Sequence, residues 1–298
     1  MKRAQLNTQI MKASDGSNSL GSNVKGKTYV VEVGSTLSDL KLVCFRGTTR
    51  YLRSCESVSS KSEWLTQSDE GRRLFLSHVE NVLKTLSQSG ELRSTVFYLG
   101  HRSDPFIPFN GKFDMMQSFL RLFKRYMPGR LFIKTRSPVV VCVLPDLQAL
   151  GPRVSIVVPI ETDVDELAKK YTPNFPRPTE RFKMARVLSN FGIEVVARVS
   201  PVLPYGSWKR DAKRFAQNLI SHVDYIQIFP LSDGSINSEK RLRKTELVQK
   251  LSADSKYQWL RPDAAEPLIK SIEMLAPQKL QEPLMAYKDG EQIGLFAA

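Results

Sequence analysis

Short apolar runs and longer amphipathic segments alternate along most of this chain, and this alternation limits its possible folds more than any other feature. The apolar runs are rich in valine, isoleucine and leucine at successive positions, as in strands that are buried on both faces. Such strands, separated by helical segments, predict an α/β fold in which crossover helices join parallel strands. We expect six strands, at Leu42–Arg46, Val96–Gly100, Leu131–Thr135, Val154–Val158, Glu194–Val199 and Tyr225–Phe229.

The segments between these runs carry apolar residues at helical spacing. Helices are expected at Asp114–Met127, Glu180–Phe191, Trp208–His222 and Ser238–Ser252. One apolar stripe of the first helix is expected in the core and contains Met116, Phe119, Leu120, Phe123 and Met127. Thr179 is the expected N-cap of the second helix, and Gly192 follows its end. A helix after every strand fits an open doubly wound sheet or a full or partial barrel, and the spacing alone does not distinguish them.

The two ends of the chain differ in composition from its middle. Residues 1–27 are rich in serine, asparagine and lysine and predict a flexible basic arm; residues 28–231 hold the strands, and residues 232–298 predict a helical extension. No apolar run approaches the roughly 20 residues of a membrane-crossing helix, and none resembles a secretory leader, so we expect no membrane contact and a cytoplasmic location. Cys44, Cys55 and Cys142 form no paired pattern and are expected to be free thiols.

The chain is strongly basic. Its 44 lysines and arginines outnumber 30 aspartates and glutamates, for a net charge of +14. This balance favours an anionic partner, most plainly the phosphates of DNA or RNA, although the charge also fits a role in solubility. No carboxylate lies between Asp114 and Asp146, a stretch that contains Arg121, Lys124, Arg125, Arg130, Lys134 and Arg136. This stretch is therefore a candidate phosphate-binding surface.

Three short segments, in this order, resemble the spore photoproduct lyase and DNA repair photolyase-like branch of the radical SAM superfamily. They are Tyr98–Pro105 (YLGHRSDP), Ile133–Pro138 (IKTRSP) and Ala197–Pro204 (ARVSPVLP), and the likeness extends from about Lys41 to Leu231. The resemblance implies a partial (β/α)6 TIM-like barrel with a 4Fe-4S cluster in a CxxxCxxC loop after the first strand. It also implies S-adenosylmethionine as the molecule that the cluster cleaves to a radical.

The loop that would hold the cluster departs from the family pattern. Phe45–Cys55 reads FRGTTRYLRSC, which places Thr48 and Leu52 at two of the three cysteine positions and keeps only Cys55. A cubane cluster needs thiolates on three of its irons, and one thiolate does not hold it. No other cysteine has the required spacing, and the histidines are isolated, so we expect neither a cluster nor another metal site.

Other positions match the family in part. Ser103 and Asp104 agree with its pattern, and Arg136 stands where the family usually has lysine, so these residues would form a vestigial S-adenosylmethionine site. An aspartate that precedes a proline is also a common turn residue, and Asp104 has that simpler interpretation.

The functional hypothesis that joins these observations is a radical SAM-like protein without its cluster. It would bind nucleic acid or act as an accessory protein, with an active homologue as one candidate partner. Parallel barrels place binding groups at the carboxyl ends of their strands, so we expect phosphate contacts from Arg102, Lys124, Arg125, Arg130, Arg136 and Arg198. The alternative for one or more of these arginines is a pair with Asp104 or Glu161 inside the barrel. The alternatives are an active radical SAM lesion lyase with an atypical cluster site and a protein-interaction role in which charge serves solubility.

Overall fold

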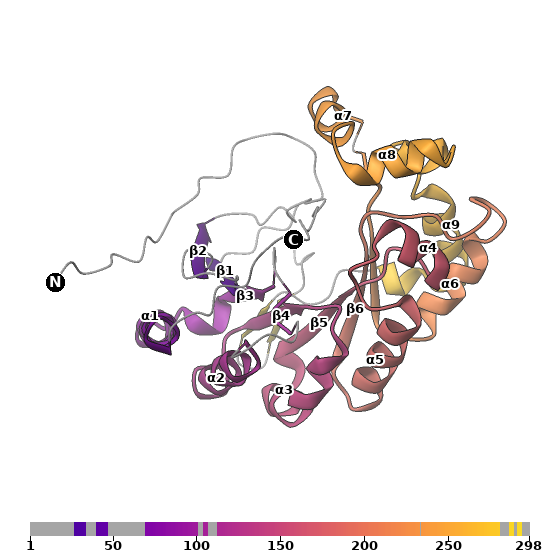
Figure 1. Cartoon of the computed structure of the whole chain (residues 1–298). Helices are drawn as coiled ribbons and strands as arrows, with labels where there is room; N and C mark the ends of the chain where they lie inside the picture. Colours follow the sequence, from indigo (N-terminus) through magenta and orange to yellow (C-terminus); the bar gives the residue numbers. More distant parts are fainter. Residues whose placement is uncertain are drawn as a thin grey trace.

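The computed structural model describes residues 27–33, 40–46, 69–100, 104–106, 112–232, 234–280, 286–288 and 291–293. Within these residues a seven-stranded sheet has the order β2-β1-β3-β4-β5-β6-β7. Figure 1 shows this sheet with helices packed along one side. Its strands are β1 (Lys27–Val33), β2 (Leu40–Arg46), β3 (Val96–Leu99), β4 (Arg130–Lys134), β5 (Val154–Pro159), β6 (Glu194–Val199) and β7 (Tyr225–Ile228).

The first predicted strand lies elsewhere in the sheet than expected. Leu42–Arg46 belongs to β2, which pairs antiparallel with β1, while β1 pairs parallel with β3. The prediction of a parallel first strand at Leu42–Arg46 is therefore wrong, and the unpredicted β1 takes that place. Only six residues separate β1 from β2 in the sequence, and a crossover to a parallel neighbour needs roughly a dozen or more.

The strand order argues against one of the two predicted architectures, the doubly wound sheet. From β3 to β7 every strand lies beside its predecessor in the chain, and all these pairs are parallel. A doubly wound sheet needs a point where this order reverses, and no such point occurs among the described strands. Right-handed crossovers without a reversal put their helices on one face, as in a TIM-like barrel. Because β7 has no further neighbour in the described sheet, closure into a barrel is not established.

The described helices are α1 (Asp69–Gln88), α2 (Lys112–Arg125), α3 (Leu144–Leu150), α4 (Asp165–Tyr171), α5 (Pro178–Asn190), α6 (Ala212–Ile220), α7 (Ile236–Leu242), α8 (Glu246–Ala253) and α9 (Glu266–Leu275). Among them, α2, α5 and α6 match predicted ones with shifted ends, whereas α1, α3, α4 and α9 were not predicted. Short 3₁₀ helices lie at Leu92–Ser94, Pro138–Val143, Gly151–Arg153, Tyr257–Leu260 and Pro277–Leu280, and a hairpin of β8 (Ala286–Lys288) and β9 (Glu291–Ile293) follows.

Two local predictions are corrected. The single helix expected at Ser238–Ser252 is divided into α7 and α8, because the Thr245 hydroxyl caps α8 by accepting a hydrogen bond from the Val248 amide at 3.4 Å. Thr179 does not cap α5, which begins at Pro178. There, the Glu180 carboxylate accepts a hydrogen bond from the amide of Arg177, the residue that precedes the helix, at 2.8 Å.

The main core lies between the sheet and the helices. Met116, Phe119, Leu120 and Phe123 of α2 are all fully buried, which confirms the predicted stripe except for Met127, a half-buried residue beyond the end of the helix. Phe123 meets Phe97 of β3 edge to face, with ring centroids 5.2 Å apart. This packing fixes the helices against the sheet and leaves the opposite face of the sheet, here called the inner face, with a different composition.

The inner face has three levels along the strand direction. Its middle is a small apolar cluster of Val96, Phe132, Val157 and Val196, packed with Tyr98 and Tyr225. Arg130, Ser155 and Glu194 precede this cluster on their strands, and Lys134 and Arg198 follow it at every second position. Charged side chains therefore lie at both ends of the inner face, separated by apolar residues.

Arg130 joins three strands at their amino ends. Its guanidinium donates to the Ser155 hydroxyl at 2.6 Å, pairs with the Glu194 carboxylate and also donates to the carbonyl of Pro152. The Ser155 hydroxyl donates in turn to Glu194 at 2.5 Å. Because Arg130 is fully buried, these partners must replace the water that its charge loses on folding.

Replacement of Arg130 by methionine should lower the free energy of unfolding by about 3 kcal/mol, since Glu194 would lose its buried counter-ion. The matched control is Arg125→Met. Arg125 pairs with Glu80 at the surface, where the two side chains are 69% and 35% exposed, so this change should cost less than about 1 kcal/mol. Urea unfolding measures both values, and equal losses in the two variants would contradict this role for Arg130.

Candidate functional site

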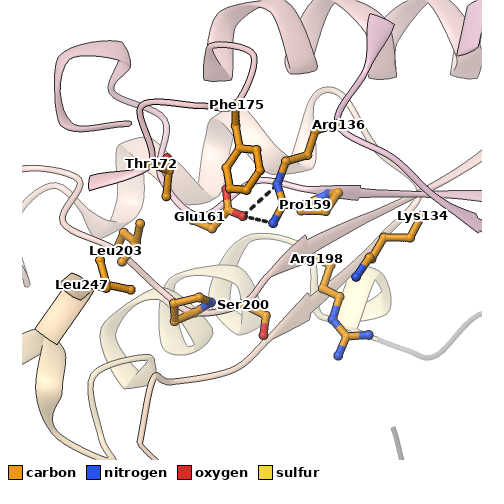
Figure 2. Close-up of a pocket in the computed structure, with 11 residues that line it drawn as sticks. Lys134, Arg136, Pro159, Glu161, Thr172, Phe175, Arg198, Ser200, Leu203 and Leu247 are labelled. Carbon is orange, nitrogen blue, oxygen red and sulfur yellow. Dashed lines mark hydrogen bonds and ion pairs between the residues drawn. The ribbon is translucent and has the colours of Figure 1, made fainter. Parts of the chain in front are cut away.

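The carboxyl ends of β4, β5 and β6 bring polar side chains to one pocket. Lys134 ends β4, Arg198 lies near the end of β6, and Glu161 follows β5 by two residues. In Figure 2 the Arg136–Glu161 pair occupies the centre of the pocket, and Lys134 and Arg198 lie to one side of it. The pocket has about 60 Å³ of room. Its described lining residues are Lys134, Arg136, Pro159, Glu161, Thr172, Phe175, Arg198, Ser200, Pro201, Leu203 and Leu247.

Glu161 is a buried carboxylate held between two arginines. Its Oε1 accepts hydrogen bonds from Nη2 and Nε of Arg136 at 2.6 and 3.2 Å, and its Oε2 accepts one from Nη1 of Arg181 at 2.6 Å. Burial by itself would raise the pKa of the Glu161 carboxyl, but the charges and hydrogen bonds of Arg136 and Arg181 outweigh it and lower this pKa to about 2. Glu161 is therefore ionised at every physiological pH.

Arg181 connects this carboxylate to the surrounding chain. It lies on α5 with its side chain 1% exposed, and it donates to the carbonyls of Pro159 at 2.7 Å and Pro176 at 2.8 Å. Burial lowers the pKa of Arg181, and the Glu161 charge opposes that change. These bonds fix the end of β5 against the start of α5, and with it the position of Glu161.

Arg136 is oriented from several sides. Its guanidinium carbon lies 4.1 Å from the ring centroid of Phe175, and Glu161 holds the guanidinium through two nitrogens. Its backbone amide donates to Asp104 at 2.7 Å. The expected alternative in which one of the arginines pairs with Glu161 is confirmed for Arg136.

Asp104 holds the β3 loop against the end of β4. Its two carboxylate oxygens accept hydrogen bonds from the Thr135 hydroxyl at 2.7 Å, the Arg136 amide at 2.7 Å and the Phe106 amide at 3.0 Å. Gly100 makes the approach possible, because a Cβ there would lie 2.5 Å from the carbonyl oxygen of Lys134. The interpretation of Asp104 as a turn residue is confirmed, and its role at a cofactor site stays a prediction.

Lys134 and Arg198 complete the cationic side of the pocket. Both are half-buried, and they project from the same face of the sheet as the pleat requires. The Arg198 guanidinium carbon also lies 5.3 Å from the ring centroid of Phe229. Among the described lining residues Glu161 is the only carboxylate, and its charge already serves Arg136 and Arg181. Cationic side chains therefore outnumber carboxylates among the described lining residues.

The structure divides the predicted phosphate-binding residues between opposite ends of the sheet. Arg136 and Arg198 lie at the carboxyl ends of the strands, whereas fully buried Arg130 lies at the amino end of β4. Lys124 and Arg125 end α2, which runs back from β3 to the start of β4, and they pair with Asp146 at 3.0 Å and Glu80 at 3.1 Å. The described residues of this set therefore do not all lie at the carboxyl ends of the strands, because a crossover helix returns its last turn to the amino ends.

Several predicted residues lie outside the described part of the chain. These are Arg102 and Ser103 and the three cluster-loop positions Thr48, Leu52 and Cys55. The amino-acid sequence shows no pattern that pairs Glu161 with Arg181. The only signal in the sequence was position. Glu161 lies two residues after the buried strand β5, and Arg136 lies two residues after β4.

Within the described residues, no three histidine, cysteine, aspartate or glutamate side chains gather as a metal site. No helix there is long and apolar enough to cross a membrane.

Comparison with known proteins gives a likeness of fold. No protein-family model matches the chain, and no curated protein sequence matches it. Among solved structures, spore photoproduct lyase complexed with dinucleoside spore photoproduct has a TM-score of 0.53 at 13% identity, over 93% of this chain and 78% of that chain. A cysteine-to-serine mutant of spore photoproduct lyase gives 0.50 at 13% identity, over 74% and 69%. The fold is therefore similar to that of spore photoproduct lyase.

Replacement of Glu161 by glutamine should lower the free energy of unfolding by about 3 to 5 kcal/mol, because Arg136 and Arg181 would lose the carboxylate that both of them contact. The exposed Glu166 on α4 is the control, and Glu166→Gln should change stability by less than about 0.5 kcal/mol. The pKa of Glu161 is lowered on folding, so its contribution is complete above pH 4.5 and disappears as the pH falls toward about 2. The measurement is urea unfolding of the wild-type protein and of Glu161→Gln at several pH values. Their free energies of unfolding should converge as the pH falls from 4.5 toward about 2, and a difference that stays constant would contradict the assignment.

Proposed function

We propose that this protein is a radical SAM-like protein that does without an iron–sulfur cluster and binds the phosphates of nucleic acid at the carboxyl ends of β4–β6. The observation that carries the proposal is the pocket itself, where Lys134, Arg136 and Arg198 meet around a carboxylate that is already paired. Phosphate is the anion that such a group of lysine and arginine side chains favours, and the net charge of +14 suits a polyanionic partner.

The residues present do not fit the group that the fold implies. A 4Fe-4S cluster requires three thiolates in its loop, and the sequence supplies Thr48, Leu52 and Cys55 at those positions. The proposal therefore derives no radical chemistry for this chain, and it assigns Lys134, Arg136 and Arg198 to binding.

Anaerobic reconstitution with iron and sulfide tests the first half of the proposal. Wild-type protein should stay colourless with far less than one cluster per chain, because one cysteine does not hold a cubane. The matched comparison is the double variant Thr48→Cys and Leu52→Cys, which restores the family pattern and should gain iron and a brown colour. Stoichiometric iron in the wild-type protein would instead support an active radical SAM enzyme with an atypical cluster site.

Filter binding to single-stranded and duplex DNA at about 50 and about 200 mM salt tests the second half. Wild-type binding should weaken steeply with salt, and Arg198→Gln should lower the affinity and reduce the salt slope by about one unit for one lost phosphate contact. Arg125→Gln removes the same charge at the opposite end of the sheet and should leave both quantities unchanged.

Two results would reject nucleic-acid binding at this site. One is the absence of wild-type binding at the lower salt concentration, where phosphate contacts are strongest. The other is an equal loss of affinity in the Arg125 and Arg198 variants, which would indicate general attraction by net charge.

A further inference from the structure

We infer that α7 and its last turn form a second nucleic-acid contact, in which Lys240, Arg243 and Lys244 bind the phosphate backbone outside the pocket. This inference rests on the proposed nucleic-acid binding and adds a surface along which the partner lies. It follows from the face that these cations share, from an exposed apolar side chain on that face and from the way the helix is held.

The exposed cations of α7 lie on one face of the helix. Arg243 and Lys244 follow Lys240 at the third and fourth positions, which are neighbours on a helix surface. The helical turn continues past the end of α7, because the Arg243 amide donates to the carbonyl of Glu239 at 3.0 Å. All three cationic side chains are exposed, and none of the ion pairs within the described part of the chain includes them. This face of α7 is therefore cationic and open to solvent.

An apolar side chain is exposed on the same face. Ile236 precedes Lys240 by four positions and is 72% exposed. The only carboxylate from residue 236 to residue 244 is Glu239, against four lysines and arginines. Solubility alone gives no reason for an exposed isoleucine beside these cations. Nucleic acid offers both phosphates and apolar contacts such as the thymine methyl group.

The other side of α7 is held against the fold. Leu242 lies two positions from Lys240 and does not share its face. It packs against a buried cluster of Tyr171, Leu203, Leu231 and Leu251. Leu247, which lines the pocket, packs against the same cluster. The cationic face is thus carried by the apolar cluster that also supports one wall of the pocket.

The chain reaches α7 through a turn beyond the carboxyl end of β7. Gly234 in this turn has a φ of +79°, and a Cβ there would lie 3.2 Å from Cγ of Pro262. Its amide donates to the hydroxyl of buried Ser232 at 3.1 Å. Because the connection to α7 leaves β7 at its carboxyl end, it starts from the same end of the sheet as the pocket. Figure 1 shows α7 beside α8 at the top of the view, well apart from α5.

Nucleic acid suits this face better than a lipid membrane does. A helix that lies in a membrane interface buries a broad apolar face. Only two residues of α7 are apolar, and one of them, Leu242, already packs inward. A nucleic-acid strand instead presents closely spaced phosphates to several cations at once.

The test compares two double variants that each remove one lysine and one arginine three positions apart. Lys240→Gln with Arg243→Gln changes the cationic face of α7. Lys183→Gln with Arg186→Gln removes the same charges from the exposed side of α5. All four side chains are exposed, so both variants should unfold at the same urea concentration as the wild-type protein. Filter binding to one DNA duplex at about 50 and about 200 mM salt gives the affinities.

The α7 variant should lose two phosphate contacts, which reduces the salt slope by about two units. Its affinity should therefore fall between the two salt concentrations by about tenfold less than that of the wild-type protein. The α5 variant should behave as the wild-type protein does. Ile236→Glu, which adds a negative charge to the same face, should also weaken binding.

Each contrary result has its own meaning. Wild-type affinity and salt slope in the α7 variant, with weaker binding by Arg198→Gln, would overturn the inference and keep the proposed function. Equal losses in the α7 and α5 variants would overturn the inference, because they would indicate attraction by net charge alone. Absence of wild-type DNA binding would overturn both. In that case, binding to phosphatidylserine vesicles that the α7 variant loses would identify a membrane surface instead.

Discussion

The ionised carboxylate of Glu161 is the interaction on which the carboxyl-end site depends. It lies between Arg136, which follows β4, and Arg181, which lies on α5, and so it joins two layers of the fold through one buried charge. A carboxylate removed from water is costly unless it is fully paired, and here both oxygens have a cationic donor. The position of Arg136, and through it the shape of the pocket, thus follows from electrostatic compensation as much as from apolar packing.

The inner face of the sheet has a set of charged side chains at each end, and the two sets differ in how their charges are paired. At the amino ends, Arg130 is matched by Glu194 and Ser155, and a compensated group of this kind holds strands together. At the carboxyl ends, the described lining residues of the pocket include the cations Lys134, Arg136 and Arg198 beside the carboxylate of Glu161. The apolar cluster around Phe132 keeps the two groups apart. Parallel topology explains why the pocket lies at the carboxyl ends, because the loops that leave all the parallel strands gather at that end of the sheet.

The sequence predicted those features that depend on neighbouring residues. The strands from β3 to β7 and the buried stripe of α2 appear in the alternation of apolar residues. Leu40–Arg46 showed the composition of a strand but not its direction, which depends on the short connection from an unpredicted partner. The arginines from 125 to 136 are close in sequence yet lie at opposite ends of the sheet, since α2 returns to the start of β4. The pairing of Glu161 with Arg181 joins residues 20 positions apart and has no local pattern.

The wall contributed by Leu247 also has a consequence for the order in which the molecule is made. Lys134, Glu161 and Arg198 leave the ribosome well before α8, which ends one residue before Asp254. Domains generally fold as units during synthesis, so the pocket is complete only after α8 has been made and Asp254 has met Tyr171.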